Sequence, residues 1–159
     1  MFGFWVFLLS ALLAFAPSCS RQAADTQPAW SVQLKITGGF TGRGNGSLRL
    51  NGDGAYLYEP PAIPNSGRKP CDGKLTTEEL TPVTRAIKQA QPTNWNLAKL
   101  KMAAPDAFGY ELELRSDPKA TPIDVVWYDN TSDQLPDDLK QLSEVLKQTM
   151  ENVKKKCPG

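Results

Sequence analysis

The sequence predicts an α+β domain in which a mainly antiparallel sheet of about four to five strands carries two helices on one face. Three observations lead to this prediction. Several short segments alternate apolar and polar residues with a period of two, as half-buried strands do. Two other segments repeat apolar residues at helical spacing. Turn sequences separate neighbouring strand segments, which favours hairpins between them.

The first half of the predicted sheet contains three strands. Residues 30–36 alternate apolar and polar side chains and form the first of them. The second is predicted over residues 47–50 and its hairpin partner over 55–58, because Asn51-Gly52-Asp53-Gly54 between them accepts the positive φ of a tight turn. Residues 38–46, between the first two strands, are too rich in glycine for a regular element.

An irregular loop and a helix are predicted next. Residues 60–73 hold four prolines and two glycines and read as a loop that carries Cys71. Thr76-Thr77-Glu78-Glu79 has the spacing of a capping box, and the helix it starts ends before Pro92. Thr81-Pro82 is a second candidate start for this helix.

The second half of the chain supplies two more strands and the last helix. Residues 108–114 show the clearest alternation in the sequence, and residues 123–127 follow as the hairpin partner. The alternating aromatic residues in these strands are interpreted as core, with a ligand cage as the alternative. From Pro136 onward the apolar residues have helical spacing, with acidic residues in the first turn and lysines in the last, as the helix dipole favours.

Charge and composition exclude several classes of function. The chain has 18 Lys+Arg against 17 Asp+Glu, so a net charge of +1 gives no reason to expect nucleic acid as a partner. It contains no histidine, which excludes Ser-His-Asp and Cys-His catalysis and His-ligated zinc. Asp137 and Asp138 do not form a convincing catalytic pair, because adjacent helix positions point apart. We therefore expect a protein without catalytic residues, metal or cofactor, and a carboxylate-dependent hydrolase is the weakest alternative.

The N-terminus has the pattern of an export signal. Residues 2–16 are almost wholly apolar and have the length of a signal-peptide core rather than of a membrane span. Ala16-Pro17-Ser18-Cys19 then resembles a bacterial lipoprotein cleavage box, which makes Cys19 the expected lipidation site. The expected organisation is a signal peptide over residues 1–18, a lipid tether over 19–28 and one domain over 29–159. We expect a membrane-anchored protein of the cell envelope, facing the periplasm or exterior. Ordinary secretion and an uncleaved anchor are the alternatives.

The cysteine count agrees with export. Lipidation of Cys19 leaves Cys71 and Cys157 as an even pair, and an oxidising compartment favours a disulfide between them. The alternative is two unrelated thiols.

Several blocks of the sequence resemble one protein family. The segment 32–42, VQLKITGGFTG, resembles the opening strand and glycine-rich turn of the emfourin family. Residues 105–112, PDAFGYEL, are similar to a later strand of that family, and residues 135–139, LPDDL, to the start of its final helix. The blocks occur in the family's order and cover about residues 30 to 150.

The resemblance implies a function and a contact site. Emfourin-like proteins are small bacterial protein inhibitors of thermolysin-type metalloproteases, so the resemblance implies a protein that occupies the cleft of a secreted metalloprotease. The expected partner-contact loop consists of Gly38, Gly39, Phe40, Thr41 and Gly42, with Phe40 as its apolar anchor. A wide hairpin connection without a partner is the other interpretation of this loop. A structural or accessory envelope module with the same fold and no protease target is the alternative function.

Overall fold

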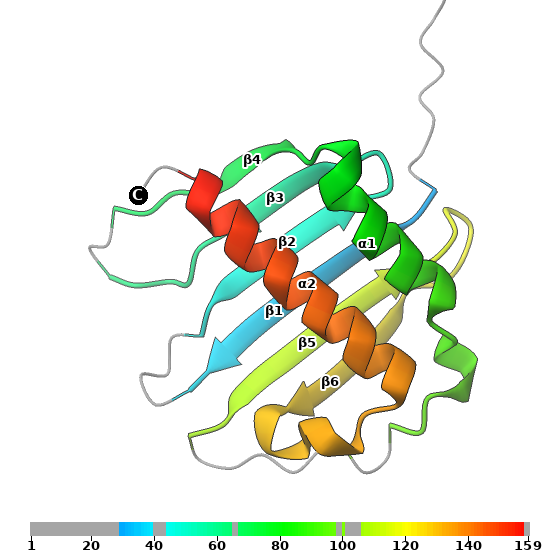
Figure 1. The fold of residues 1–159 in the computed structure, drawn as a ribbon. Coiled ribbons are helices and arrows are strands. Elements are labelled where there is room, and N and C mark those ends of the chain that lie inside the picture. The colour runs from blue at the N-terminus through cyan, green and yellow to red at the C-terminus, as the bar shows by residue number, and fades with distance from the viewer. Residues whose placement is uncertain (1–28, 40–43, 65–66, 98–99, 101–105, 158–159) are drawn as a thin grey trace, which may run out of the picture.

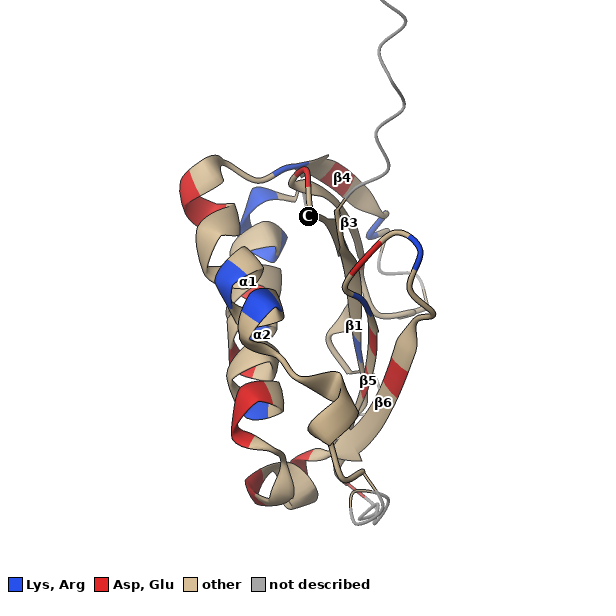
Figure 2. Cartoon of the chain, turned by 90° about the vertical axis from the view of Figure 1, so that its right-hand side faces the viewer, with Lys and Arg blue, Asp and Glu red and all other residues tan. Residues whose placement is uncertain are grey.

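The structure is a computed structural model that describes residues 29–39, 44–64, 67–97, 100 and 106–157. One antiparallel sheet of six strands has the order β4-β3-β2-β1-β5-β6, and two long helices cover one of its faces (Figures 1 and 2). The elements in chain order are β1 (Ser31–Gly38), β2 (Gly46–Asn51), β3 (Ala55–Glu59), β4 (Cys71–Lys74), α1 (Thr77–Gln89), η1 (Pro92–Asn94), β5 (Phe108–Arg115), β6 (Ile123–Tyr128), η2 (Asp129–Gln134) and α2 (Asp137–Lys156). The predicted fold class is confirmed.

The strand count differs from the prediction, because the sheet has six strands rather than four to five. The additional strand, β4, lies at the end of the segment expected to be an irregular loop. Its sequence, Cys-Asp-Gly-Lys, shows no apolar alternation. It is extended because it pairs with β3, where Cys71 lies opposite Tyr58 and Lys74 opposite Ala55. A neighbouring strand edge therefore determines β4, and local sequence does not.

Strand β1 lies in the middle of the sheet and pairs with β2 on one side and β5 on the other. Its alternate residues face the helices, and Leu34 lies between Leu48 of β2 and Leu112 of β5. All three are at most 1% exposed. The period of two puts Gln33 and Lys35 on the opposite face, which the helices leave open (Figure 2).

Helix α1 begins at the predicted capping box. The Thr76 side chain accepts a hydrogen bond from the Glu79 backbone at 3.3 Å, and the Glu79 carboxylate accepts one from the Thr76 backbone at 2.9 Å. Pro82 lies inside the helix, so the second candidate start is not used. The helix ends at Gln89, before Pro92, as predicted.

Helix α2 packs its predicted apolar stripe onto the sheet. The residues of the stripe are at most 1% exposed, and they are Leu139, Leu142, Leu146, Met150 and Val153. The helix runs across the sheet beside α1 (Figure 1), and Lys156 at its end forms an ion pair of 2.6 Å with Glu79 at the start of α1. The two helices thus lie side by side, with an exposed ion pair at one end that contributes little to stability.

Candidate functional site

The base of the β1–β2 loop is the part of the predicted contact loop that the structure describes. Gly38 is the last residue of β1 and lies opposite Phe108 of β5. The Gly39 backbone N–H donates to the Ala107 carbonyl at 3.1 Å, and a Cβ at Gly39 would lie 2.5 Å from the Phe108 ring. The loop therefore leaves β1 with its backbone pressed against the start of β5.

The other end of the loop is held in the same way. The Gly44 N–H donates to the Gly38 carbonyl at 2.8 Å, and the Asn45 N–H donates to the Ile36 carbonyl at 3.0 Å. Gly44 has a φ of +61°, and a Cβ there would collide with the Ile36 carbonyl. Only glycine adopts this positive φ readily and has no Cβ to collide with the carbonyl. Close packing within the chain therefore accounts for Gly44, as it does for Gly39, one of the glycines expected to contact a partner.

Tyr58 of β3 is hydrogen-bonded to the end of the loop at Asn45. The Tyr58 hydroxyl donates to the Asn45 carbonyl at 2.9 Å, and the Tyr58 ring is 4% exposed. Burial, followed by the negative charge of Glu151, raises the pKa of Tyr58. The hydroxyl thus keeps its proton at neutral pH and remains a donor.

Four predicted site residues lie outside the described part of the chain. These are Phe40, Thr41 and Gly42 of the contact loop and Cys19, the expected lipidation site. Gly38 and Gly39 are described, and both lie at the fixed base of the loop.

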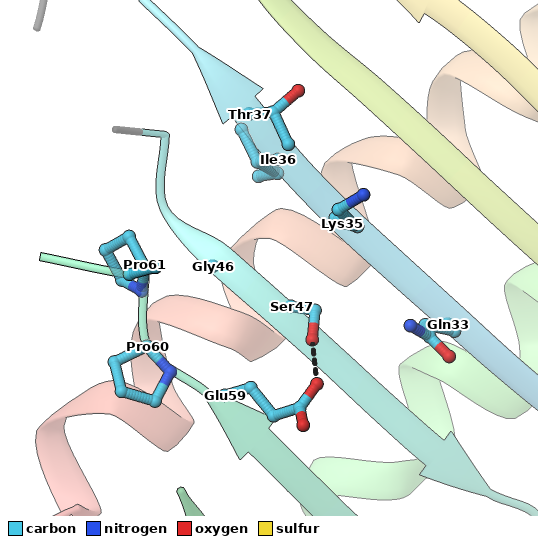
Figure 3. Close-up of a pocket in the computed structure, with 10 residues that line it drawn as sticks. Gln33, Lys35, Ile36, Thr37, Gly46, Ser47, Glu59, Pro60 and Pro61 are labelled. Carbon is cyan, nitrogen blue, oxygen red and sulfur yellow. Dashed lines mark hydrogen bonds between the residues drawn. The ribbon is translucent and has the colours of Figure 1, made fainter. Parts of the chain in front are cut away.

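A pocket of about 350 Å³ opens on the uncovered face of the sheet beside this loop. Figure 3 shows side chains of β1 along one side, Ser47 of β2 on the floor, and Glu59, Pro60 and Pro61 at the end of β3 on the other side. Ser47 and Glu59 are directly opposite in the register, and the Ser47 hydroxyl donates to Glu59 Oε2 at 2.9 Å. This hydrogen bond sets the direction of the carboxylate.

Sequence reasoning missed this pocket. Its lining residues come from three segments that do not show a common pattern in the chain, and only the pairing of β1, β2 and β3 brings them together. The one local signal is the Pro60-Pro61 pair directly after a strand, because proline cannot continue a central strand.

Two cations on the open face already have partners. Lys35 forms an ion pair of 2.9 Å with Glu111 of β5, and both side chains are almost half exposed. The Arg49 guanidinium donates to Gln33 Oε1 at 3.2 Å from Nε and at 2.9 Å from Nη2. Pairs as exposed as these contribute little to stability, because water competes for each charge. They do determine which charges are available to a ligand.

The alternating aromatic residues belong to the core, as interpreted from the sequence. Trp127 is 1% exposed and Tyr110 is 9% exposed, and their rings stack with centroids 5.2 Å apart. Phe108 is partly buried against the same core. Lys147 of α2 lies over the Tyr110 ring, 5.5 Å from its centroid, and covers it from the helix side.

Asp138 joins the start of α2 to the segment after α1. Its Oδ2 accepts hydrogen bonds from the Gln91 backbone at 2.7 Å and from the Trp95 indole at 2.9 Å. Burial by itself raises the pKa of the Asp138 carboxyl, but these hydrogen bonds favour the charged form and bring its pKa below the usual value. The sequence analysis assigned Asp138 only to the helix dipole and missed this link, since the partners are more than forty residues away.

The predicted pair of cysteines forms a disulfide. Cys71 of β4 and Cys157 at the end of α2 are bonded, with their Cα atoms 5.8 Å apart. The bond attaches the edge of the sheet to the helix layer.

The described residues offer neither a metal-binding cluster nor a membrane-spanning helix. These contain no group of three or more His, Cys, Asp or Glu side chains arranged to hold a metal ion. Within the same ranges, no helix is both long and apolar enough to cross a membrane.

Comparison with known proteins gives no family. No protein-family model matches the sequence, and no curated protein matches it.

Proposed function

We propose that this protein is an exported, lipid-anchored inhibitor of a secreted thermolysin-type metalloprotease, and that its β1–β2 loop enters the active-site cleft. The observation that carries the proposal is the fixed base of the loop. Both ends are held by backbone hydrogen bonds of 2.8 to 3.1 Å, from Gly39, Gly44 and Asn45. A loop whose two ends are already held in place loses less conformational entropy on binding than a loop with free ends, so more of its contact energy is available as affinity.

The resemblance to the emfourin family supports the same conclusion. It assigns the family's glycine-rich turn to residues 38–42, the first two of which lie at this base, and an inhibitor requires complementary shape rather than catalytic groups. The sequence has no histidine to supply a base or a zinc ligand. Inhibition by contact needs neither a catalytic group nor a cofactor.

Inhibition is tested with the mature chain, in which Cys19 is replaced by Ala so that it stays free of lipid. The protein is titrated against a thermolysin-type metalloprotease and, as a specificity control, against a trypsin-type serine protease. Stoichiometric loss of metalloprotease activity alone is the expected result. Absence of inhibition at a large molar excess would contradict the proposal and favour an accessory module of the cell envelope.

The loop assignment has its own test. Phe40→Ala removes the proposed apolar anchor, and an interfacial phenylalanine of this kind contributes about 2 kcal/mol, so the inhibition constant should rise about thirtyfold. Val126→Ala is the matched control, because Val126 is an apolar side chain on β6 that is 47% exposed. Equal inhibition by both variants would show that the loop is not the contact site.

Lipid anchoring is tested by labelling the full chain with radioactive palmitate in a bacterial host. Label that is present in the native chain and lost in Cys19→Ala would support the anchor. Label that persists in the variant would contradict it.

A further inference from the structure

The pocket beside the β1–β2 loop ends in an oriented carboxylate. Glu59 accepts a hydrogen bond from Ser47 at 2.9 Å, and Ser47 is itself only 7% exposed, so the support comes from within the sheet. Glu59 takes part in none of the five ion pairs found between described residues.

The cations nearest the pocket do not satisfy this carboxylate. Lys35 lines the pocket, but its amino group is bonded to Glu111 at 2.9 Å, and Figure 3 shows the side chain directed toward β5 and away from Glu59. Arg49 points its guanidinium at Gln33. Neither Lys35 nor Arg49 is bonded to Glu59, so its carboxylate can accept hydrogen bonds from a further donor.

The walls of the pocket are part apolar and part polar. Pro60, Pro61 and Ala62 supply apolar surface beside Glu59, and proline offers no backbone N–H to compete for the carboxylate. The lining also includes polar side chains of β1 and β2, which are Gln33, Lys35, Thr37 and Ser47. An apolar wall beside a carboxylate matches a side chain with an aliphatic stem and a cationic head.

The pocket is large enough to take one long side chain. Its volume of about 350 Å³ is at the lower end of the range for small-molecule sites. Arginine fits best by chemistry, because its planar guanidinium can donate two parallel hydrogen bonds to one carboxylate.

We propose that this pocket binds an arginine side chain of a polypeptide partner, with Glu59 as the counter-ion and Pro60 and Pro61 as the wall along the aliphatic stem. The pocket lies between the end of β1 and the start of β2, the two strands that the loop connects. A protein that contacts the loop can therefore place an arginine in it. The charge and shape of the pocket carry this inference, whichever protein the loop contacts.

The test uses a blocked amino acid and does not depend on inhibition. N-acetyl-arginine methylamide is titrated into the ¹⁵N-labelled mature chain, and amide resonances are followed by NMR. We expect saturable shifts at Gly46, Ser47 and Glu59. The citrulline analogue has nearly the same shape without the charge, and it should bind about fivefold more weakly or worse, as loss of a charge-assisted pair at a partly exposed site predicts.

Two variants separate the pocket from general surface charge. Glu59→Gln should weaken binding of the arginine probe by about fivefold or more. Asp72→Asn removes an exposed negative charge from the same face of the neighbouring strand β4, outside the pocket, and should change the affinity less than twofold. Well-dispersed spectra of both variants establish that they are folded.

Three results would overturn the inference. They are equal affinity for the arginine and citrulline probes, equal loss in the two variants, and no shift at Ser47 or Glu59 in the presence of tens of millimolar probe. None of them bears on whether the loop inhibits a protease, so the two proposals can fail separately.

Discussion

Replacing Cys71 and Cys157 by alanine removes the covalent link between the edge strand β4 and the end of α2. The fold should survive this change. The last turns of α2 keep their apolar contacts, because Met150 and Val153 are fully buried, and the ion pair between Lys156 and Glu79 remains. We therefore expect a circular-dichroism spectrum like that of the native protein, and lower stability.

The loss of stability follows from the length of chain that the bond closes. The two cysteines are 86 residues apart, for which the chain-entropy model gives about 4.5 kcal/mol, because an open chain has many more unfolded conformations. Residual structure in the unfolded state reduces this figure, so we expect a loss of about 3 to 4.5 kcal/mol. A single domain has a free energy of unfolding of only about 5–15 kcal/mol, so the variant should be only marginally stable.

Urea unfolding followed by tryptophan fluorescence measures this difference. Trp127 is 1% exposed in the fold, so its fluorescence changes when the protein unfolds. The variant should have a lower midpoint and a larger m value, since its unfolded chain is more extended, and its melting temperature should fall by about 15 °C. Reductant should destabilise the native protein to a similar extent and leave the variant unchanged. A loss of less than about 1 kcal/mol would refute the reasoning from loop closure.

Three further predictions concern single side chains, each measured by urea unfolding of the folded variant. Asp138→Ala leaves the Trp95 indole without its acceptor and should cost about 2 kcal/mol at pH 7, against less than about 0.5 for Asp137→Ala. The pKa of Asp138 is lower in the fold than its value of about 3.9 in the unfolded chain, so the ionised carboxylate stabilises the fold above that value. The difference in unfolding free energy between Asp138→Ala and the native protein should therefore shrink as pH falls through the lower pKa. A difference independent of pH would contradict this assignment. Gly46→Ala combines a positive φ with a backbone collision and should lower the free energy of unfolding by about 3 kcal/mol. Gly67 also has a positive φ, but a Cβ there would have no atom within 4 Å, so Gly67→Ala should cost about 1 kcal/mol. Equal losses in the two variants would exclude the collision. Leu142→Ala should cost about 3 kcal/mol, since Leu142 is completely buried, and a loss below about 1 would mean that α2 is not packed as described.

Most secondary structure could be read from the sequence because local physics determines it. In β1 the alternation that buries Leu34 and exposes Lys35 is a property of consecutive side chains on a pleated strand. The Thr76–Glu79 capping box is complete within four residues, and the acidic start and basic end of α2 interact with the dipole of their own helix. Such signals do not need the rest of the fold.

The disulfide was predictable for a different reason. The expectation that Cys19 is lipidated left Cys71 and Cys157 as an even pair, and an oxidising compartment favours a disulfide between them. The number of cysteines does not predict which elements the bond connects. Only the fold shows that it connects the strand edge at Cys71 to the end of α2 at Cys157.

The candidate site depends on contacts between segments that are distant in the chain. Strand β4 has no apolar pattern and is a strand only because β3 offers it an edge. The pocket exists because β2 places Ser47 opposite Glu59, and Asp138 is bonded to Trp95 because α2 docks beside the segment after α1. Periodicity and capping depend on neighbouring residues, so the sequence alone determined both long helices, five of the six strands and the core face. Pockets and shared hydrogen bonds require the relative positions of separate elements, and only the tertiary structure decided those.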